Sequence, residues 1–455
     1  MAALMAALGP APRPVLMLGL CAAALCGCAA VPGPGLPDRP ALATSVAGLR
    51  HETALPARLG VEDLARLAVE NDPDLRAARA RHDIARAQLL QAGLLPNPQV
   101  SLTYTPTLAG PGIANAWSAG LSQDLRALIL RPAAVRAARA GLHQVDAEIL
   151  WQEWQVAGQA RLLGVQLIEE ARMLALQDRI RAVLERQTAA LRGALARNDT
   201  TFASLAPDLG ALAGLQAQQR DTRRLMLQQK QTLAVLLDLQ PEAALPLAAR
   251  AELAPFDAAA IRASVPTLPD RRPDLIALRW GYEASRQKLR TALLSQFPPL
   301  SFGPVGGSDN TNVRSMGPQL AFELPVFDQG QGGVAMARAT RRQLYEAYVA
   351  RLAATLSEVR ARLDALDQIE RQIRQAAPAL AYARQAAASV QGGEVSRLID
   401  PQARIDLLSA YVTRQTEMIA LQQASLEQQV AIETLAGTGL PSAAPALRIA
   451  QGAPR

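Results

Sequence analysis

The chain has 455 residues, of which 50% are hydrophobic, 19% charged and 4% aromatic. This composition excludes a disordered chain, a collagen-like chain and a small scaffold that depends on disulfides. The net charge of +7 comes from 47 basic and 40 acidic residues, and the arginines are scattered at helical spacings among Ala, Gln and Glu. No basic stripe with interleaved aromatic residues is present, so the sequence predicts no nucleic-acid partner.

The N-terminus has the pattern of a secretory signal. Arg13 precedes a short apolar run from Val15 to Leu25, and small residues follow. The ending Leu-Cys-Gly-Cys at Cys28 resembles the bacterial lipobox, which implies cleavage before Cys28 and acylation of that cysteine, as with palmitate. By the same resemblance, Ala29 behind it implies the outer membrane. An ordinary signal peptide with an incidental cysteine is the alternative.

All three cysteines lie before residue 29, so we expect neither disulfides nor thiolate metal ligands in the rest of the chain. No other stretch approaches 18 uninterrupted apolar residues, which argues against a transmembrane helix in the mature protein. Any segment that spans a membrane must therefore be built from strands.

The sequence repeats itself at a shift of about 200 residues. Pro-Asp-Leu at 73–75 matches Pro-Asp-Leu at 273–275, and Pro98 falls on Pro298. Two halves therefore share one plan. The expected organisation is a lipoprotein signal peptide (1–27), an N-terminal linker (28–59), a first repeat (60–240), an inter-repeat linker (241–268), a second repeat (269–440) and a C-terminal tail (441–455).

Helices dominate both repeats. Residues ~61–95 and ~272–296 place apolar side chains three and four apart and are followed by prolines, which predicts helices that stop there. Longer helical runs are expected over ~132–198 and ~333–392, the second with a coiled-coil-like apolar seam and a kink at Pro378. Short turns should lead from them into return helices. We expect these over ~208–239 and ~401–436.

A β-hairpin interrupts the helices in each repeat, over 98–124 and 299–324. Connectors rich in Gly, Pro and Asn are expected at 106–115 and 304–312. Apolar and polar residues alternate along the strands, which is typical of strands with a lipid-facing and a lumen-facing side. The predicted lipid-facing set is Val100, Leu102, Tyr104, Trp117, Leu121, Phe302, Leu320 and Phe322. The polar set expected toward the lumen is Ser101, Thr103, Ser118, Ser122 and Ser301.

The order helix, hairpin, long helix, turn and helix, written twice, resembles the TolC-like outer-membrane efflux family. The phrases that carry the resemblance are Asn-Asp-Pro-Asp-Leu-Arg-Ala-Ala-Arg at 71–79, Gly-Leu-Leu-Pro-Asn-Pro at 93–98, and Leu-Pro-Val-Phe-Asp-Gln-Gly at 324–330. The last phrase is more similar to the heavy-metal efflux branch. The resemblance covers residues ~60–440.

The resemblance implies a mainly helical fold in which a two-repeat coiled-coil tunnel continues into a transmembrane β-barrel. Each protomer of a homotrimer would contribute four strands to a twelve-stranded barrel, and a periplasmic adaptor protein and an inner-membrane efflux pump would be partners. The tapered periplasmic end of the tunnel would carry charged residues at its aperture. The candidates are Asp199, Asp208, Asp400, Asp406, Arg397 and Arg404, for which solvated turns and helix caps are the alternative.

The sequence predicts no enzyme, no cofactor and no metal site. His51, His82 and His143 do not have a metal-ligand spacing. We therefore expect a lipid-anchored outer-membrane channel with a periplasmic helical extension, which conducts metal ions or small organic compounds out of the cell. The alternative is a periplasmic coiled-coil adaptor or scaffold lipoprotein, which would have no use for amphipathic hairpins.

Overall fold

The computed structural model describes residues 35–51, 54–108, 114–389 and 401–440. The chain divides into two units, Met1–Leu42 and Ala43–Arg455, and all elements discussed below belong to the second. The predicted signal peptide and Cys28 lie outside the described residues.

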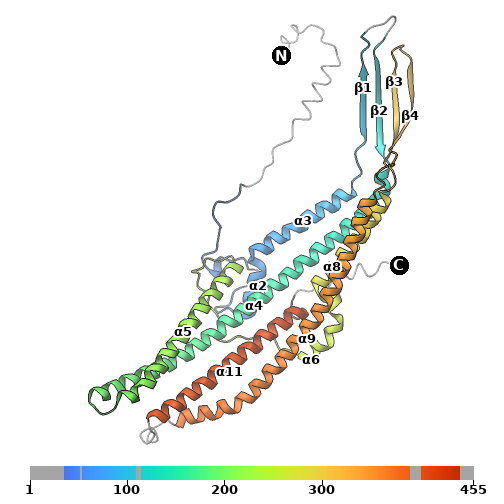
Figure 1. The fold of residues 1–455 in the computed structure, drawn as a ribbon. Helices are drawn as coiled ribbons and strands as arrows, with labels where there is room; N and C mark the ends of the chain where they lie inside the picture. Colours follow the sequence, from blue (N-terminus) through green and yellow to red (C-terminus); the bar gives the residue numbers. More distant parts are fainter. Residues whose placement is uncertain (1–34, 52–53, 109–113, 390–400, 441–455) are drawn as a thin grey trace, which may run out of the picture. The chain divides into compact units, whose positions relative to one another are not determined.

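The second unit contains the same series of elements twice (Figure 1). The first series is α2 (Val61–Asn71), α3 (Pro73–Gly93), β1 (Gln99–Thr105), β2 (Ala116–Asp124), α4 (Arg126–Ala196) and α5 (Phe202–Leu236). The second is α6 (Ala258–Ser264), α7 (Leu268–Arg271), α8 (Pro273–Leu294), β3 (Leu300–Ser308), β4 (Arg314–Phe322), α9 (Gln331–Ser389) and α11 (Pro401–Ala436). The predicted fold class, mainly helical with four strands, is confirmed.

The helix expected over ~61–95 is two helices. Asp72 separates α2 from α3, and its carboxylate accepts a 2.7 Å hydrogen bond from the backbone N–H of Leu75. Pro73 occupies the first turn of α3, where its missing N–H costs nothing. A proline before an apolar run therefore starts a new helix here, and the apolar periodicity alone did not reveal the break.

Two helices begin earlier than expected, so that Pro132, predicted to start a helix, and Pro207, predicted to precede one, both lie inside helices. Pro132 lies in the second turn of α4, which begins at Arg126 because the Asp124 carboxylate accepts a 2.8 Å hydrogen bond from the Arg126 N–H. Pro207 lies in α5, which begins at Phe202. Both prolines are close to a helix start, where few i to i−4 bonds are lost. The helices are consequently longer than predicted at these ends.

The first strand of the second hairpin is longer than predicted. The expected connector at 304–312 is largely strand, because β3 continues to Ser308 and Pro304 lies opposite Pro318 of β4. On its other side, β3 pairs with β2 except at Pro304 and the preceding Gly303. The proline without an N–H thus coincides with a gap in the ladder, as a strand proline requires.

The four strands form one antiparallel sheet in the order β1-β2-β3-β4. The central pair, β2 with β3, joins the hairpin of the first repeat to that of the second. In the described residues, β1 pairs only with β2 and β4 only with β3. The sheet therefore ends in two unpaired edges.

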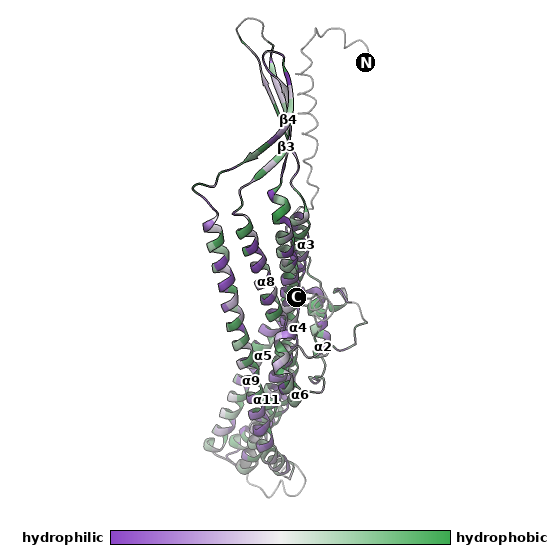
Figure 2. Cartoon of the chain, turned by 90° about the vertical axis from the view of Figure 1, so that its right-hand side faces the viewer, coloured by the Kyte–Doolittle hydropathy of each residue, from purple (hydrophilic) through white to green (hydrophobic). Residues whose placement is uncertain are grey.

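The helical part has its cores near the short helices. One apolar cluster joins α2, α4 and α5, with Leu64 and Leu233 fully buried. A second joins α6 and α7 to α9 and α11 around Leu268 and Leu366. Along α9, hydrophilic and apolar segments alternate (Figure 2). The two clusters hold each long helix against its return helix, and the hairpins and the α4–α5 turn lie at opposite ends of α4 (Figure 1).

Candidate functional site

The strand register places apolar and polar residues on opposite faces of the sheet. Directly opposite residues share a face, and Leu102 lies opposite Ala119 while Tyr104 lies opposite Trp117. Phe302 lies opposite Gln123 on one side and Leu320 on the other. Followed across all four strands, one face carries Val100, Leu102, Tyr104, Trp117, Leu121, Phe302, Leu320 and Phe322. The opposite face carries Ser101, Thr103, Ser118, Ser122 and Ser301.

All eight of these predicted apolar residues are exposed in the single chain, from Leu121 at 45% to Leu102 at 78%. A soluble surface rarely gathers so many large apolar side chains on one sheet. An apolar environment or a partner must therefore cover this face.

The described tip of the first repeat is the turn between α4 and α5. Arg197 and Asp199 form an ion pair there, with 2.8 Å between Nε and Oδ2, and both side chains are more than half exposed. Asn198 between them adopts a left-handed backbone, with φ of 61°, which lets the chain reverse. The predicted tip residue Asp199 therefore lies at the surface, paired with Arg197.

Asp208 differs from the other aperture candidates. Its side chain is fully buried, two turns into α5. Among the described residues, neither of its carboxylate oxygens has a hydrogen-bond partner. Burial raises the pKa of this carboxyl group. In this conformation Asp208 cannot line an aqueous aperture, which removes it from that set.

The tip of the second repeat is described only in part. Arg397 and Asp400 lie outside the described residues, and so does the side chain of Arg404. Asp406 lies in α11 and is exposed.

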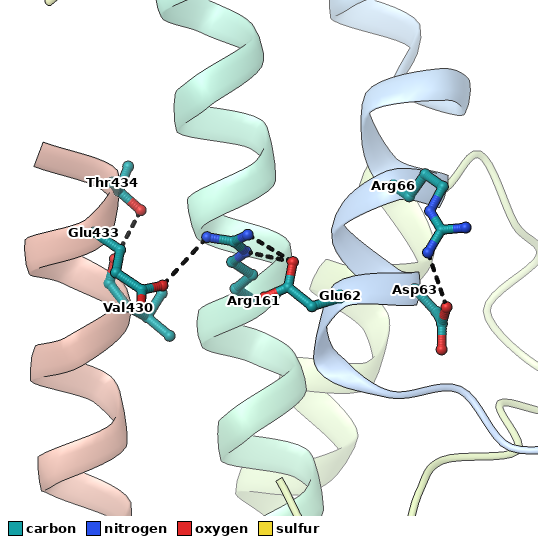
Figure 3. A network of polar contacts seen from close by, with 7 residues as sticks. All are labelled: Glu62, Asp63, Arg66, Arg161, Val430, Glu433 and Thr434. Atoms are coloured by element: carbon teal, nitrogen blue, oxygen red, sulfur yellow. Dashed lines mark hydrogen bonds and ion pairs between the residues drawn. The ribbon is translucent and has the colours of Figure 1, made fainter. Parts of the chain in front are cut away.

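A buried arginine joins the two repeats (Figure 3). Arg161 of α4 forms an ion pair of 2.6 Å with Glu62 of α2 and one of 3.4 Å with Glu433 of α11. The side chains of Arg161 and Glu433 are 6% and 7% exposed. Burial raises the pKa of Glu433, Arg161 opposes that shift and Glu62 adds to it. One guanidinium thus holds two carboxylates of different repeats.

The sequence analysis did not identify Arg161, nor a second buried arginine, Arg272. Arg272 is fully buried and forms a 2.7 Å ion pair with Asp274. The sequence does contain a signal for Arg272. Directly before the shared Pro-Asp-Leu phrase, the first repeat has Asp72 and the second repeat has Arg272. A charge reversal within an otherwise matched phrase indicates a partner that differs between the repeats.

The histidines do not form a site. His82 Nδ1 lies 2.6 Å from an Asp146 oxygen on the neighbouring helix, and the ring of His143 lies 4.7 Å from that of Trp280. His51 is exposed near the start of the described chain. Across the described residues, no group of three or more His, Cys, Asp or Glu side chains is placed to hold a metal ion.

None of the helices that the structure describes is both long and apolar enough to cross a membrane.

Comparison by sequence identifies no relative, since no family model matches the chain. No curated protein matches it either.

Comparison by structure is informative. The outer membrane channel CmeC of Campylobacter jejuni superposes with a TM-score of 0.70 at 14% identity, covering 93% of this chain and 98% of that one. The outer membrane protein VceC of Vibrio cholerae superposes with a TM-score of 0.66 at 19% identity, covering 84% of this chain and 97% of that one. The outer membrane channel MtrE of Neisseria gonorrhoeae, in its open state, superposes with a TM-score of 0.66 at 17% identity, covering 91% of this chain and 99% of that one. The chain therefore has the fold of outer membrane channel proteins over nearly its full length, and these neighbours are channels rather than enzymes.

Proposed function

We propose that this protein is the outer-membrane channel of a tripartite efflux system and has no enzymatic activity. It would act as a homotrimer with a periplasmic adaptor protein and an inner-membrane pump. The likeness to outer membrane channels supports this proposal. The observation that carries it is the four-stranded sheet whose register gathers the large apolar residues on one face.

The two free edges of the sheet supply the argument for a trimer. Unpaired backbone groups in lipid cost several kcal/mol each, so an open four-stranded sheet is not viable there. Pairing β4 of one protomer with β1 of the next satisfies both edges. Three copies of four strands give twelve strands, 3 × 4, and the apolar face would contact lipid while the serine-rich face lines the lumen.

The helical tips would form the periplasmic aperture. A three-fold axis brings three copies of each inward-facing acidic side chain together, and their negative potentials add. Asp199 and Asp406 are the described candidates, and we include Asp400, Arg397 and Arg404 on the basis of the sequence resemblance. Such rings favour cations. The exported solute would be a metal ion or a small organic compound, in keeping with the phrase at 324–330.

A lipid anchor at Cys28 would add to membrane attachment without being its main source. A single acyl chain binds a membrane only marginally, whereas a closed barrel buries far more apolar surface. Cell fractionation of the Cys28→Ser variant, followed by mass photometry of the detergent extract, tests the proposal. We expect the variant in the outer membrane as a trimer. Its release into the soluble periplasm, or a stable monomer, would favour the adaptor or scaffold alternative.

A further inference from the structure

A cavity of about 430 Å³ lies between α4, α5 and α11, well away from the strands. Leu184 of α4, Leu215 of α5 and Val412 of α11 contribute apolar walls. Leu184 and Leu215 are each only 8% exposed. The volume and the mostly apolar lining match those of small-molecule sites, which hold a ligand with a few well-placed polar groups.

Gly214 helps to make the space. It lines the cavity from α5, and a Cβ placed on it would meet no atom within 4 Å. Glycine in the interior of a helix is destabilising relative to residues with side chains. The cavity therefore exists partly because the helix lacks a side chain where one would extend into it.

The lining contains one charge, and it is positive. Arg179 of α4 is the only ionisable Lys, Arg, Asp or Glu residue among the lining residues. Its described hydrogen bond, 3.3 Å long, goes to the carbonyl of Ala175 in its own helix. No carboxylate in the described part of the chain pairs with its guanidinium within 4.0 Å, unlike the nearby Arg181 and Arg223, which both pair with Asp178.

The side chain of Gln187 supplies a donor without an acceptor among the described residues. Gln187 lines the same cavity and is 8% exposed, and its Nε2 is buried with no hydrogen-bond partner among the described residues. A buried donor left unpaired is costly, so an acceptor brought by a ligand would be favoured. Arg179 and Gln187 lie two turns apart on α4. The cavity thus offers a guanidinium and an amide N–H beside an apolar wall.

We propose that this cavity is a binding site for a small amphipathic anion with a rigid apolar body. The apolar body lies between Leu184, Leu215 and Val412, the anionic group faces Arg179, and Gln187 donates to an acceptor on the ligand. A rigid body is favoured because a flexible chain loses more conformational freedom on binding. A bound anion contacts α4 and α5 of the first repeat and α11 of the second, so it stabilises the arrangement in which these helices surround it.

This site rests on the helices alone and is independent of the proposed channel function. The test uses the full-length protein in lipid nanodiscs and two fluorescent probes, with empty nanodiscs as the blank. 8-Anilinonaphthalene-1-sulfonate is an anion, and N-phenyl-1-naphthylamine has the same ring system without the sulfonate. We expect Arg179→Gln to weaken the anionic probe about tenfold, the loss of one charge-assisted contact, and to leave the neutral probe within about twofold.

A matched pair of variants tests the location. Gly214→Phe places a ring in the cavity and should weaken both probes about tenfold or more. Gly210→Phe lies one turn earlier on α5, also faces open space and does not line the cavity, so its binding should equal that of the wild type. Both variants replace a helical glycine by a better helix former, and circular dichroism checks that they fold. Unchanged binding in Gly214→Phe, or equal losses of both probes in Arg179→Gln, would overturn the proposal.

Discussion

The guanidinium of Arg272 lies over the indole ring of Trp151, with 4.7 Å between Cζ and the ring centroid. Arg272 is fully buried and donates to Asp274 and to the carbonyl of Leu435. Arg351 of α9 donates to the same Asp274 at 2.7 Å and also lies over Trp151. This cluster, which we call the Arg272 cluster, joins α8, α9, α4 and α11 at one point.

Removal of Arg272 should destabilise the helical part strongly. Arg272→Met leaves Asp274 buried with one partner fewer, and the loss of one member of a buried pair costs about 3 to 5 kcal/mol. Arg279→Met is the control, because Arg279 forms an exposed pair with Asp270 and such pairs contribute about 0 to 1 kcal/mol. Chemical unfolding followed by circular dichroism measures both. Equal losses of unfolding free energy would show that the cluster is no more than a surface pair.

The Arg272 cluster should also make stability depend on acid. Burial alone would raise the pKa of Asp274, but the hydrogen bonds and charges of Arg272 and Arg351 outweigh it and lower the pKa below its ordinary value of 3.8. A carboxyl group with a lowered pKa stabilises the folded state above its unfolded pKa, and this contribution disappears as pH falls through the folded pKa. The stability difference between the wild type and Asp274→Asn should therefore be large near pH 7 and shrink below pH 3.8. A difference that is constant with pH would contradict this assignment.

Asp208 should behave in the opposite way. Its pKa is raised by burial, so the folded state prefers the protonated form and loses stability as pH rises from 3.8 through the raised pKa. Asp208→Leu removes a buried carboxylate that has no hydrogen-bond partner among the described residues, and it should stabilise the protein at neutral pH by about 1 to 3 kcal/mol. Asp208→Asn removes the charge alone, and its gain should vanish in acid. A loss of stability in Asp208→Leu at neutral pH would mean that the carboxylate has a favourable partner in the assembly.

The two faces of the sheet should tolerate charge very differently. Leu102→Arg places a charge on the apolar face and should cost roughly 2 to 4 kcal/mol near the bilayer midplane. Thr103→Arg, one residue later and on the serine-rich face, should cost far less. The folded fraction in outer membranes, measured by heat-dependent migration on gels, separates the two. Similar yields from both variants would argue against a lipid-facing apolar face.

Asp406 should contribute to ion preference at the periplasmic end. Three copies of an acidic side chain around one axis attract cations, so Asp406→Ala should move the reversal potential in a salt gradient toward zero in planar bilayers. Asp221→Ala is the control, because Asp221 is an exposed residue of α5 that pairs with Arg224. If both variants keep the wild-type reversal potential, Asp406 does not belong to the aperture.

Local patterns determined much of this protein in advance. Alternation of apolar and polar residues predicted the strands and their two faces, since side chains of a strand alternate whatever its partners are, although β3 was expected to end before Pro304. The duplicated Pro-Asp-Leu phrase indicated two halves of one plan. Helix ends were less accurate at Pro132, Pro207 and Asp72, because a proline near a helix start is compatible with either continuation or a new start.

Only the tertiary structure decided which elements meet. The pairing of β2 with β3 crosses the two repeats, at the point where α4 begins and after α8 has ended. Arg161 pairs with Glu433, which is 272 positions further along the chain, and Arg272 donates to the carbonyl of Leu435, which is 163 positions further along. Asp208 is buried although its neighbours in sequence include exposed residues. Periodicity reports which face of an element is apolar. It does not report which distant helix covers that face, because this choice is made by packing between whole elements.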